Sequence, residues 1–268
     1  MSNHPIGIFD SGVGGLTIWR AIKNKLPKAS IIYVADQKNC PYGNKNQDEI
    51  FKLTEKCVEF LIDKSCKIII IACNTATAVA IHELRKKHRN ILFVGLEPAV
   101  KPAAVNTQKG VIGVLATANT LIGKHYLKTS QKYGKNVKVN AVAGHGLVEL
   151  IETGNESEKL EKLILEYLQL LDYKNIDYLV LGCTHYPLIF AEIQKICGAA
   201  VNIIDSAGAV ARQVEKLLLQ SNITVQTTTR LQFFTTGELN LFKKFLFEKI
   251  LNDDMSSVET ASIAEVHL

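Results

Sequence analysis

The chain has 268 residues, of which 47% are apolar and 21% are charged, and its formal net charge is +5. This length allows one large or two ordinary domains, and the composition is typical of a soluble protein with a sizeable core. No apolar run approaches the roughly 20 residues that a membrane-spanning helix needs, so the sequence predicts no such helix. The first residues lead straight into a predicted strand, and we expect no signal peptide.

Six cysteines occur without a C-x-x-C pair, which predicts reduced thiols and a cytoplasmic location. Positive charge is densest at residues 85–89, at the end of a predicted helix. Because cations are favoured at helix C-termini, we interpret this cluster as a helix end and predict no nucleic-acid partner.

The first third of the chain alternates apolar β-branched runs with amphipathic stretches. Strands are predicted at residues 5–10, 31–35, 68–71 and 91–96. Helices are predicted at residues 16–25, 47–63 and 75–87, and a short helix follows Pro98. Alternation of this kind predicts a parallel sheet that is covered by helices.

A glycine-rich turn, Asp10-Ser11-Gly12-Val13-Gly14-Gly15, follows the first predicted strand. It matches neither G-x-G-x-x-G nor the Walker motif, and Asp10 would repel a phosphate. We therefore interpret it as a tight turn that exposes Asp10 and Ser11, and not as a nucleotide site. A simple turn cap is the alternative role for Asp10.

The pattern restarts at Gly110, where residues 111–117 parallel residues 5–11. Strands are predicted at residues 111–117, 137–142, 179–182 and 201–204. Helices are predicted from Asn119, at 147–152, at 158–171 and after Pro187. The strand before Cys183 corresponds to the strand before Cys73, so the sequence predicts two similar doubly wound α/β domains with mainly parallel sheets.

The C-terminal part adds a predicted helix at 207–219, a strand at 230–234 and a helix at 238–250, and we expect it to pack on the first domain. The predicted domains are therefore 1–98 plus 207–268, which carries Cys73, and 99–206, which carries Cys183. From about Asn252 the chain lacks periodicity, and we expect a frayed tail. Ligands bind at the carboxyl ends of parallel strands, so the active site is expected in a cleft between the domains.

Cys73 and Cys183 each end an apolar strand and precede a predicted helix. A helix N-terminus carries partial positive charge and favours a thiolate. One thiol on each face of a carbon atom can remove a proton from one side and return a proton to the other. Asp10 and His185 are the predicted neighbours that tune Cys73 and Cys183, respectively.

Other thiol chemistries explain less of the sequence. A phosphatase loop of the C-x₅-R type would need arginine where Val79 and Ile189 stand. A zinc site at Cys183 and His185 lacks further ligands at suitable spacing, and no metal is predicted. A Cys–His hydrolase would use Cys183 with His185 and leave Cys73 unexplained. A two-domain protein that only binds an amino acid would not need thiols.

The chain resembles glutamate racemases in four segments, at residues 8–17, 40–43, 72–76 and 181–188. Glutamate racemases are cofactor-independent enzymes that supply D-glutamate for bacterial peptidoglycan. The wider aspartate/glutamate racemase superfamily shares the paired cysteines. The D-S-G-x-G-G and P-Y-G motifs point to the glutamate branch, and an aspartate or other amino-acid racemase is the alternative.

The resemblance implies that Cys73 is the base for D-glutamate and Cys183 the base for L-glutamate, with Asp10 and His185 assisting. It implies substrate contacts at Asp10, Ser11, Pro41, Tyr42, Gly43, Asn74, Thr75, Thr117, Thr120, Thr184 and His185. It also implies no cofactor, no metal, no membrane partner and a homodimer.

The resemblance also implies that Asp36, Glu152 and His185 correspond to the family's auxiliary acidic and histidine positions. The run at 144–152 departs from the more apolar, proline-containing sequence that is usual in the family. This departure leaves Glu149 as an alternative to Glu152.

Overall fold

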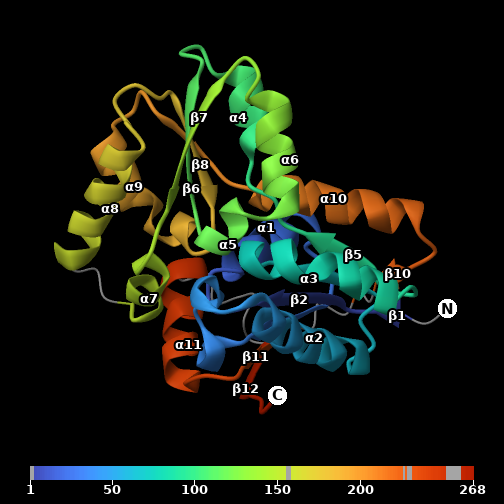
Figure 1. The fold of residues 1–268 in the computed structure, drawn as a ribbon. Helices are drawn as coiled ribbons and strands as arrows, with labels where there is room; N and C mark the ends of the chain where they lie inside the picture. Colours follow the sequence, from blue (N-terminus) through green and yellow to red (C-terminus); the bar gives the residue numbers. More distant parts are fainter. Residues whose placement is uncertain (1–2, 155–157, 226, 228–230, 252–260) are drawn as a thin grey trace. The chain divides into compact units, whose positions relative to one another are not determined.

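The computed structural model describes residues 3–154, 158–225, 227, 231–251 and 261–268. The chain divides into two compact units, one made of residues 1–96 and 207–268 and the other of residues 97–206. Each unit is an α/β structure built on a parallel sheet (Figure 1). None of the described helices combines the length and apolar character that crossing a membrane requires.

The sheet of the first unit contains six strands among the described residues, and every neighbouring pair is parallel. In spatial order they are β12 (Ala261–Glu265), β11 (Leu231–Thr235), β3 (Ile31–Ala35), β2 (Ile6–Asp10), β4 (Ile68–Ile71) and β5 (Leu92–Gly95). A separate short parallel pair joins β1 (Asn3–His4) to β10 (Thr224–Val225).

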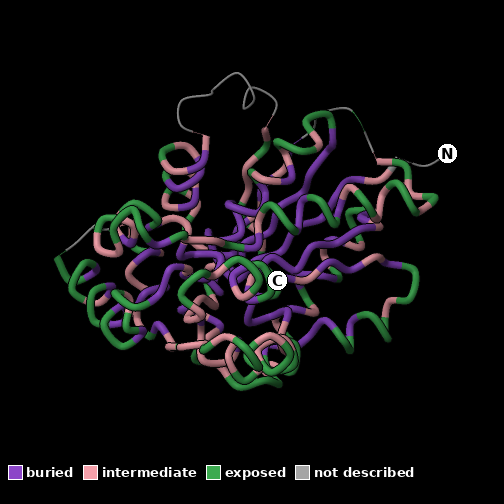
Figure 2. Tube along the Cα trace, turned by 90° about the horizontal axis from the view of Figure 1, so that it is seen from above, coloured by how far each residue is buried: buried purple, intermediate pink, exposed green. Residues whose placement is uncertain are grey.

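Helices cover both faces of this sheet. They are α1 (Leu16–Lys25), α2 (Gln47–Asp63), α3 (Asn74–Lys87), α10 (Ala207–Gln220) and α11 (Leu239–Phe245), with short turns η1 (Gln37–Asn39) and η2 (Tyr42–Asn44). Phe9, Ile69 and Ile71 pack with α2 and α3. Phe233 lies on the other side, against Trp19 of α1 and a ring of α11. Burial on both faces explains why the strands are continuous apolar runs (Figure 2).

The described part of the second unit has four parallel strands in the order β7 (Lys138–Ala143), β6 (Val111–Ala116), β8 (Tyr178–Gly182) and β9 (Asn202–Ile204). Its helices are α4 (Val100–Asn106), α5 (Ala118–Leu121), α6 (Lys124–Tyr133), α7 (Leu147–Glu152), α8 (Glu158–Leu170) and α9 (Phe190–Cys197), with the 3₁₀ turn η3 (Tyr186–Ile189).

The internal repeat is visible in the strand order. The run β3-β2-β4-β5 in the first sheet has the same order and direction as β7-β6-β8-β9 in the second. In each repeat the first strand is central, the second strand flanks it on one side, and the third strand, which leads to the cysteine, flanks it on the other. The predicted fold class, two similar α/β halves with mainly parallel sheets, is confirmed.

The C-terminal part differs from its prediction in two places. The helix predicted at 238–250 is α-helical only to Phe245, and η4 (Leu246–Leu251) continues it as a π-helix. The prediction of a frayed tail is wrong for residues 261–265, because β12 pairs along its whole length with β11. The remainder of that predicted tail, residues 252–260, lies outside the described residues. β12 was missed because its partner strand, and not its own sequence pattern, holds it in the sheet.

Candidate active site

Cys73 follows β4 and is the N-cap of α3. Its Sγ accepts a hydrogen bond from the backbone N–H of Ala76 at 3.4 Å, and the residue is only 6% exposed. A sulfur in this position faces the N–H groups of the first helical turn and the positive end of the helix dipole, both of which stabilise a thiolate. The structure thus places Cys73 as the sequence predicts.

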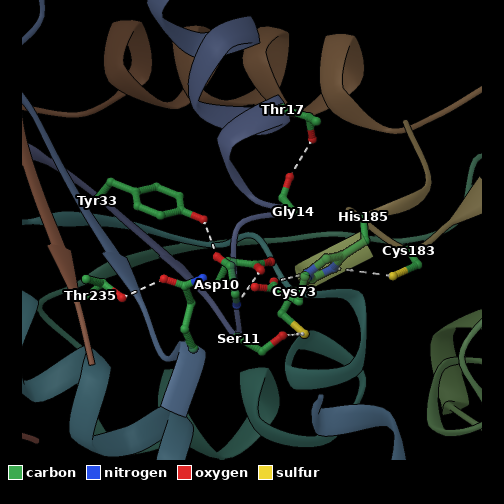
Figure 3. Close-up of polar contacts among 12 residues, drawn as sticks. Asp10, Ser11, Gly14, Thr17, Tyr33, Cys73, Cys183, His185 and Thr235 are labelled. Carbon is green, nitrogen blue, oxygen red and sulfur yellow. Dashed lines mark hydrogen bonds and ion pairs between the residues drawn. The ribbon is translucent and has the colours of Figure 1, made fainter. Parts of the chain in front are cut away.

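Ser11 lies beside Cys73 at the end of the neighbouring strand β2. Its hydroxyl donates to Cys73 Sγ at 3.4 Å (Figure 3). Asp10 is fully buried, and its Oδ1 accepts from the backbone N–H of Gly12 at 2.8 Å, which is the turn-capping contact. The turn also requires a glycine at Gly15, because a Cβ there would lie 2.5 Å from Asp10 Cβ.

Asn74 and Thr75 form the first turn of α3 and are both buried. Asn74 is 4% exposed, and its Nδ2 has no hydrogen-bond partner among the described residues. A buried amide donor without a partner costs free energy, and a bound acceptor would remove that cost. This amide is therefore suited to hold an anionic or carbonyl oxygen of a ligand.

Asp36 fixes the loop that carries Pro41, Tyr42 and Gly43. The Tyr42 hydroxyl donates to Asp36 Oδ2 at 2.7 Å, and Asn39 Nδ2 donates to both carboxylate oxygens at 3.0 Å. Burial raises the pKa of Tyr42, and negative charge on nearby groups, Asp36 among them, reinforces this effect. The phenol therefore stays protonated and remains a hydrogen-bond donor.

Cys183 follows β8 and is also 6% exposed. Its Sγ lies 3.8 Å from His185 Nδ1, and the ring of His185 points toward it (Figure 3). On the other side of the ring, His185 Nε2 lies 2.5 Å from Glu152 Oε1. Glu152 is therefore the carboxylate that contacts His185, and the three side chains form a thiol–imidazole–carboxylate chain.

The helix predicted after Pro187 is present as α9, but it does not directly follow Cys183. The residues that follow Cys183 form the 3₁₀ turn η3, whose N-cap is His185, and α9 begins only at Phe190. Cys183 is thus not a helix N-cap, and the expectation that both cysteines stand at equivalent helix starts is wrong.

Two tyrosines support the loop that precedes α7 and Glu152. Tyr186 donates to the carbonyl of Gly144 at 3.2 Å, and Tyr167 donates to the carbonyl of His145 at 2.7 Å. Gly144 must lack a side chain, because a Cβ would lie 2.5 Å from the Tyr186 hydroxyl. Burial raises the pKa of Tyr186, with negative charge on Cys183 adding to the effect.

The remaining predicted contacts of the second unit lie at the ends of β6 and β8. Thr117 Oγ1 accepts from the backbone N–H of Thr120 at 3.3 Å, and the two hydroxyl oxygens lie 2.8 Å apart. Thr117 thereby caps α5, and Thr184 is buried next to Cys183.

A possible metal-ligand group in the first unit is already engaged. Among the described residues, Glu55, Glu59 and His88 bring ligand atoms within 4.8 Å of one another. Lys87 Nζ bonds both carboxylates, at 2.8 Å and 3.0 Å. The lysine thus supplies the positive charge that a cation would bring.

Sequence reasoning missed several supporting residues. Tyr33 donates to the carbonyl of Gly12 at 2.7 Å, inside the turn that holds Asp10 and Ser11. Thr236 donates to Asp36 Oδ1 at 2.7 Å. A signal for Thr236 was present, because polar residues directly follow a predicted strand there, as Ser11 follows β2.

Comparison with known proteins identifies the family. Residues 16–214 match the family described as Asp/Glu/Hydantoin racemase. A glutamate racemase of Herpetosiphon aurantiacus is 41% identical over 247 residues, which cover 91% of this chain and 97% of that protein. The chain belongs to this family, and its curated relatives are glutamate racemases. It is therefore an enzyme, an isomerase of the amino-acid racemase type.

Solved structures agree with this assignment. The glutamate racemase isoform RacE1 of Bacillus anthracis is 33% identical, with a TM-score of 0.84 over 100% of this chain and 99% of that chain. A Francisella tularensis glutamate racemase, solved in complex with D-glutamate, is 31% identical, with a TM-score of 0.82 over 100% of this chain and 98% of that chain.

Proposed function

We propose that this enzyme interconverts L-glutamate and D-glutamate without a cofactor, with Cys73 and Cys183 as the two acid/base groups. The observation that carries this proposal is the placement of both thiols at the same point of the repeat. Cys73 follows β4, which pairs with the first strand β2, and Cys183 follows β8, which pairs with the first strand β6. A duplicated thiol is expected when a reaction has the same chemical task on each face of a carbon atom.

The proposed reaction moves one proton off the α-carbon and another proton onto it. From L-glutamate, the Cys183 thiolate removes the α-proton, and the electron pair is delocalised into the carboxylate. The Cys73 thiol then donates its proton to the opposite face and yields D-glutamate. The enzyme is left with Cys73 as thiolate and Cys183 as thiol, which is the state that accepts D-glutamate.

Neighbouring groups support these roles. Ser11 and the Ala76 N–H donate to Cys73 Sγ, and both bonds stabilise the thiolate more than the thiol. Near Cys183, the imidazole of His185 is held by Glu152, so it can exchange a proton with the sulfur. We propose that the unpaired Asn74 amide and the hydroxyls of Thr75, Thr117, Thr120 and Thr184 bind the substrate, together with the loop Pro41–Gly43.

The cellular role follows from the same proposal. D-glutamate made by this enzyme would supply peptidoglycan synthesis and hence cell-wall formation and cell shape. All six cysteines are free thiols, which supports a cytoplasmic location. We propose a homodimer as the active form, which sedimentation of the purified protein tests directly.

Racemisation in heavy water tests the mechanism. Purified enzyme without added cofactor should convert either glutamate enantiomer, followed by circular dichroism, and should incorporate deuterium at the α-carbon. Cys73→Ser and Cys183→Ser should each lower the rate by at least about a thousandfold, because serine is a far weaker acid and base near neutral pH. Full activity in either variant would refute the two-thiol mechanism. A panel that includes aspartate tests the substrate assignment separately.

A further inference from the structure

The C-terminal segment Thr235–Gly237 lies against the loop that begins at Asp36, and its function is not explained by the reaction described above. β11 pairs with β3 in parallel, with Thr235 opposite Ala35. The residues that follow the two strands therefore leave the sheet side by side. This arrangement joins two parts of the sequence that are about 200 residues apart.

Several hydrogen bonds connect these two parts. The Thr236 backbone N–H donates to the Ala35 carbonyl at 3.0 Å. The Thr236 hydroxyl donates to Asp36 Oδ1 at 2.7 Å and accepts from the Lys38 N–H at 3.2 Å. Thr235 donates to Gln37 Oε1 at 2.7 Å. The contact is tight, because a Cβ on Gly237 would lie 2.7 Å from Gln37 Cβ.

The Thr236 hydroxyl completes the set of donors around the Asp36 carboxylate. Asp36 is buried and accepts from Thr236 on Oδ1, from Tyr42 on Oδ2 and from Asn39 on both oxygens. A buried carboxylate needs such donors to offset its lost hydration. Since these donors engage both oxygens, the carboxylate acts here as a fixed anchor for the Tyr42 side chain.

Tyr42 connects this anchor to the candidate active site within the first unit. Its ring packs in the same buried cluster as Cys73 and Ala76. Burial raises the pKa of Tyr42 most, followed by the charges of Cys57 and Asp36 and the hydrogen bond to Asp36, and negative charge on the nearby Cys73 sulfur adds to the effect. The turn η2, which contains Tyr42 and Gly43, packs against α3. Any rotation of Asp36 therefore shifts a loop that borders Cys73.

We propose that Thr236 is a positioning residue for substrate binding, acting through Asp36 on the Tyr42–Gly43 loop. This inference rests on the proposed function, in which that loop contacts glutamate. Thr236 does not touch the substrate, and its hydroxyl sets the orientation of the loop before the substrate arrives. Its loss should weaken the binding of substrate and transition state alike.

Steady-state kinetics of Thr236→Val and Thr236→Ser test this role. Valine keeps the shape and removes the hydroxyl, so KM should rise roughly three- to tenfold for both enantiomers, with kcat within about twofold of the wild type. Serine retains the hydroxyl and should restore KM. Thr236→Val in the background of Tyr42→Phe should add little, because both changes interrupt the same path.

Thr54→Val is the matched control. Thr54 is a buried threonine of the first unit whose hydroxyl donates to the Ile50 carbonyl of its own helix at 2.7 Å. This variant should lose stability without a change in KM. An unchanged KM in Thr236→Val, an equal rise in Thr54→Val, or additive effects with Tyr42→Phe would each refute the positioning role. If the wild-type enzyme fails to interconvert glutamate enantiomers, it is the proposed function that fails.

Discussion

Cys73 and Cys183 occupy the same topological position in the two repeats, yet the structure surrounds the two sulfurs with different groups. Cys73 is a helix N-cap that accepts from a hydroxyl and a peptide N–H. Cys183 lies before a 3₁₀ turn and faces an imidazole that is held by a carboxylate. The two repeats thus place each thiol at the same point of its sheet, but they surround the two sulfurs with different hydrogen-bonding groups.

This difference implies two kinds of proton control. The Ser11 hydroxyl and the Ala76 N–H are neutral donors that keep their protons, so these two groups stabilise a thiolate at Cys73 without exchanging a proton with it. The His185 ring at Cys183 can itself accept or release a proton, and Glu152 stabilises its charged form. We therefore expect changes in the second unit to affect proton transfer more strongly than changes in the first.

Kinetic isotope effects can distinguish a slower proton transfer at Cys73 from a slower proton transfer at Cys183, whereas the overall rates cannot. The enantiomers have equal free energy, so kcat/KM must fall by the same factor in both directions for any variant. A slower step at Cys183 should instead increase the isotope effect with α-deuterated L-glutamate and decrease it with α-deuterated D-glutamate. A slower step at Cys73 should give the opposite pattern.

The largest effect is expected for Glu152→Gln. This change removes the negative charge that contacts His185 Nε2. A hydrogen bond to a charged group contributes about 1.5–3 kcal/mol, so we expect kcat/KM to fall roughly ten- to a hundredfold. The isotope effect should rise for deuterated L-glutamate and fall for deuterated D-glutamate. Measuring both enantiomers with the same enzyme preparation provides the comparison.

Glu149→Gln is the control for this prediction. Glu149 lies on the same helix α7 and is half-buried, and it was the alternative suggested by the sequence. Its replacement should leave the balance of the two isotope effects unchanged. If Glu149→Gln and Glu152→Gln behaved alike, a specific role for the contact between Glu152 and His185 would be ruled out.

For Ser11→Ala we expect a smaller loss of kcat/KM than for Glu152→Gln, and isotope effects that change in the opposite direction. The variant removes one of the donors to Cys73 Sγ and leaves the N–H of Ala76 in place. We expect kcat/KM to fall roughly three- to tenfold, the range for one modest hydrogen bond. The isotope effect should rise for deuterated D-glutamate. A rise for deuterated L-glutamate instead would mean that Ser11 does not act through Cys73.

The smallest effect on catalysis is expected for Asp177→Asn, which should instead lower the free energy of unfolding. Burial favours a raised pKa for Asp177, but hydrogen bonds from Thr107 and the N–H groups of Gln108 and Lys109 outweigh it and lower the pKa. A lowered pKa in the folded state stabilises the fold above the unfolded value of roughly 3.9. This contribution is lost as pH falls through the folded pKa.

Denaturant unfolding at several pH values checks this prediction. Asp177→Asn should be less stable than the wild type by about 1–3 kcal/mol at pH 7, and the difference should shrink below about pH 4. Its isotope effects should match those of the wild type. A stability difference that is independent of pH down to acid conditions would contradict the role of the charged carboxylate.

Local sequence signals predicted most of the fold. The apolar runs of β2, β4, β6 and β8 were recognisable because strands that are buried on both faces must be apolar throughout. The similarity of residues 5–11 to residues 111–117 then predicted two related halves, and the common strand order agrees with it. Both signals lie within short segments, which is why one sequence was sufficient to detect them.

Contacts between distant segments could not be predicted in the same way. The sequence around Cys183 resembles a helix start, and only the structure shows that η3 intervenes before α9. Similarly, the pairing of β11 with β3 brings Thr236 to Asp36, and no local pattern records that pairing. The sequence favoured Glu152 and left Glu149 as an alternative, because the contact with His185 that separates the two is made in space and not in the local sequence.

The place of β11 in the first sheet has a consequence for the order in which the protein is completed during synthesis. β11 is an inner strand, with β3 on one side and β12 on the other, although it is encoded after the entire second unit. A nascent chain that ends at Ser206 already contains both cysteines and all the contiguous residues of the second unit. The same chain still leaves the backbone edge of β3 uncovered, and exposed edges invite aggregation. Residues that follow the second unit in the chain thus complete a sheet whose other strands precede that unit.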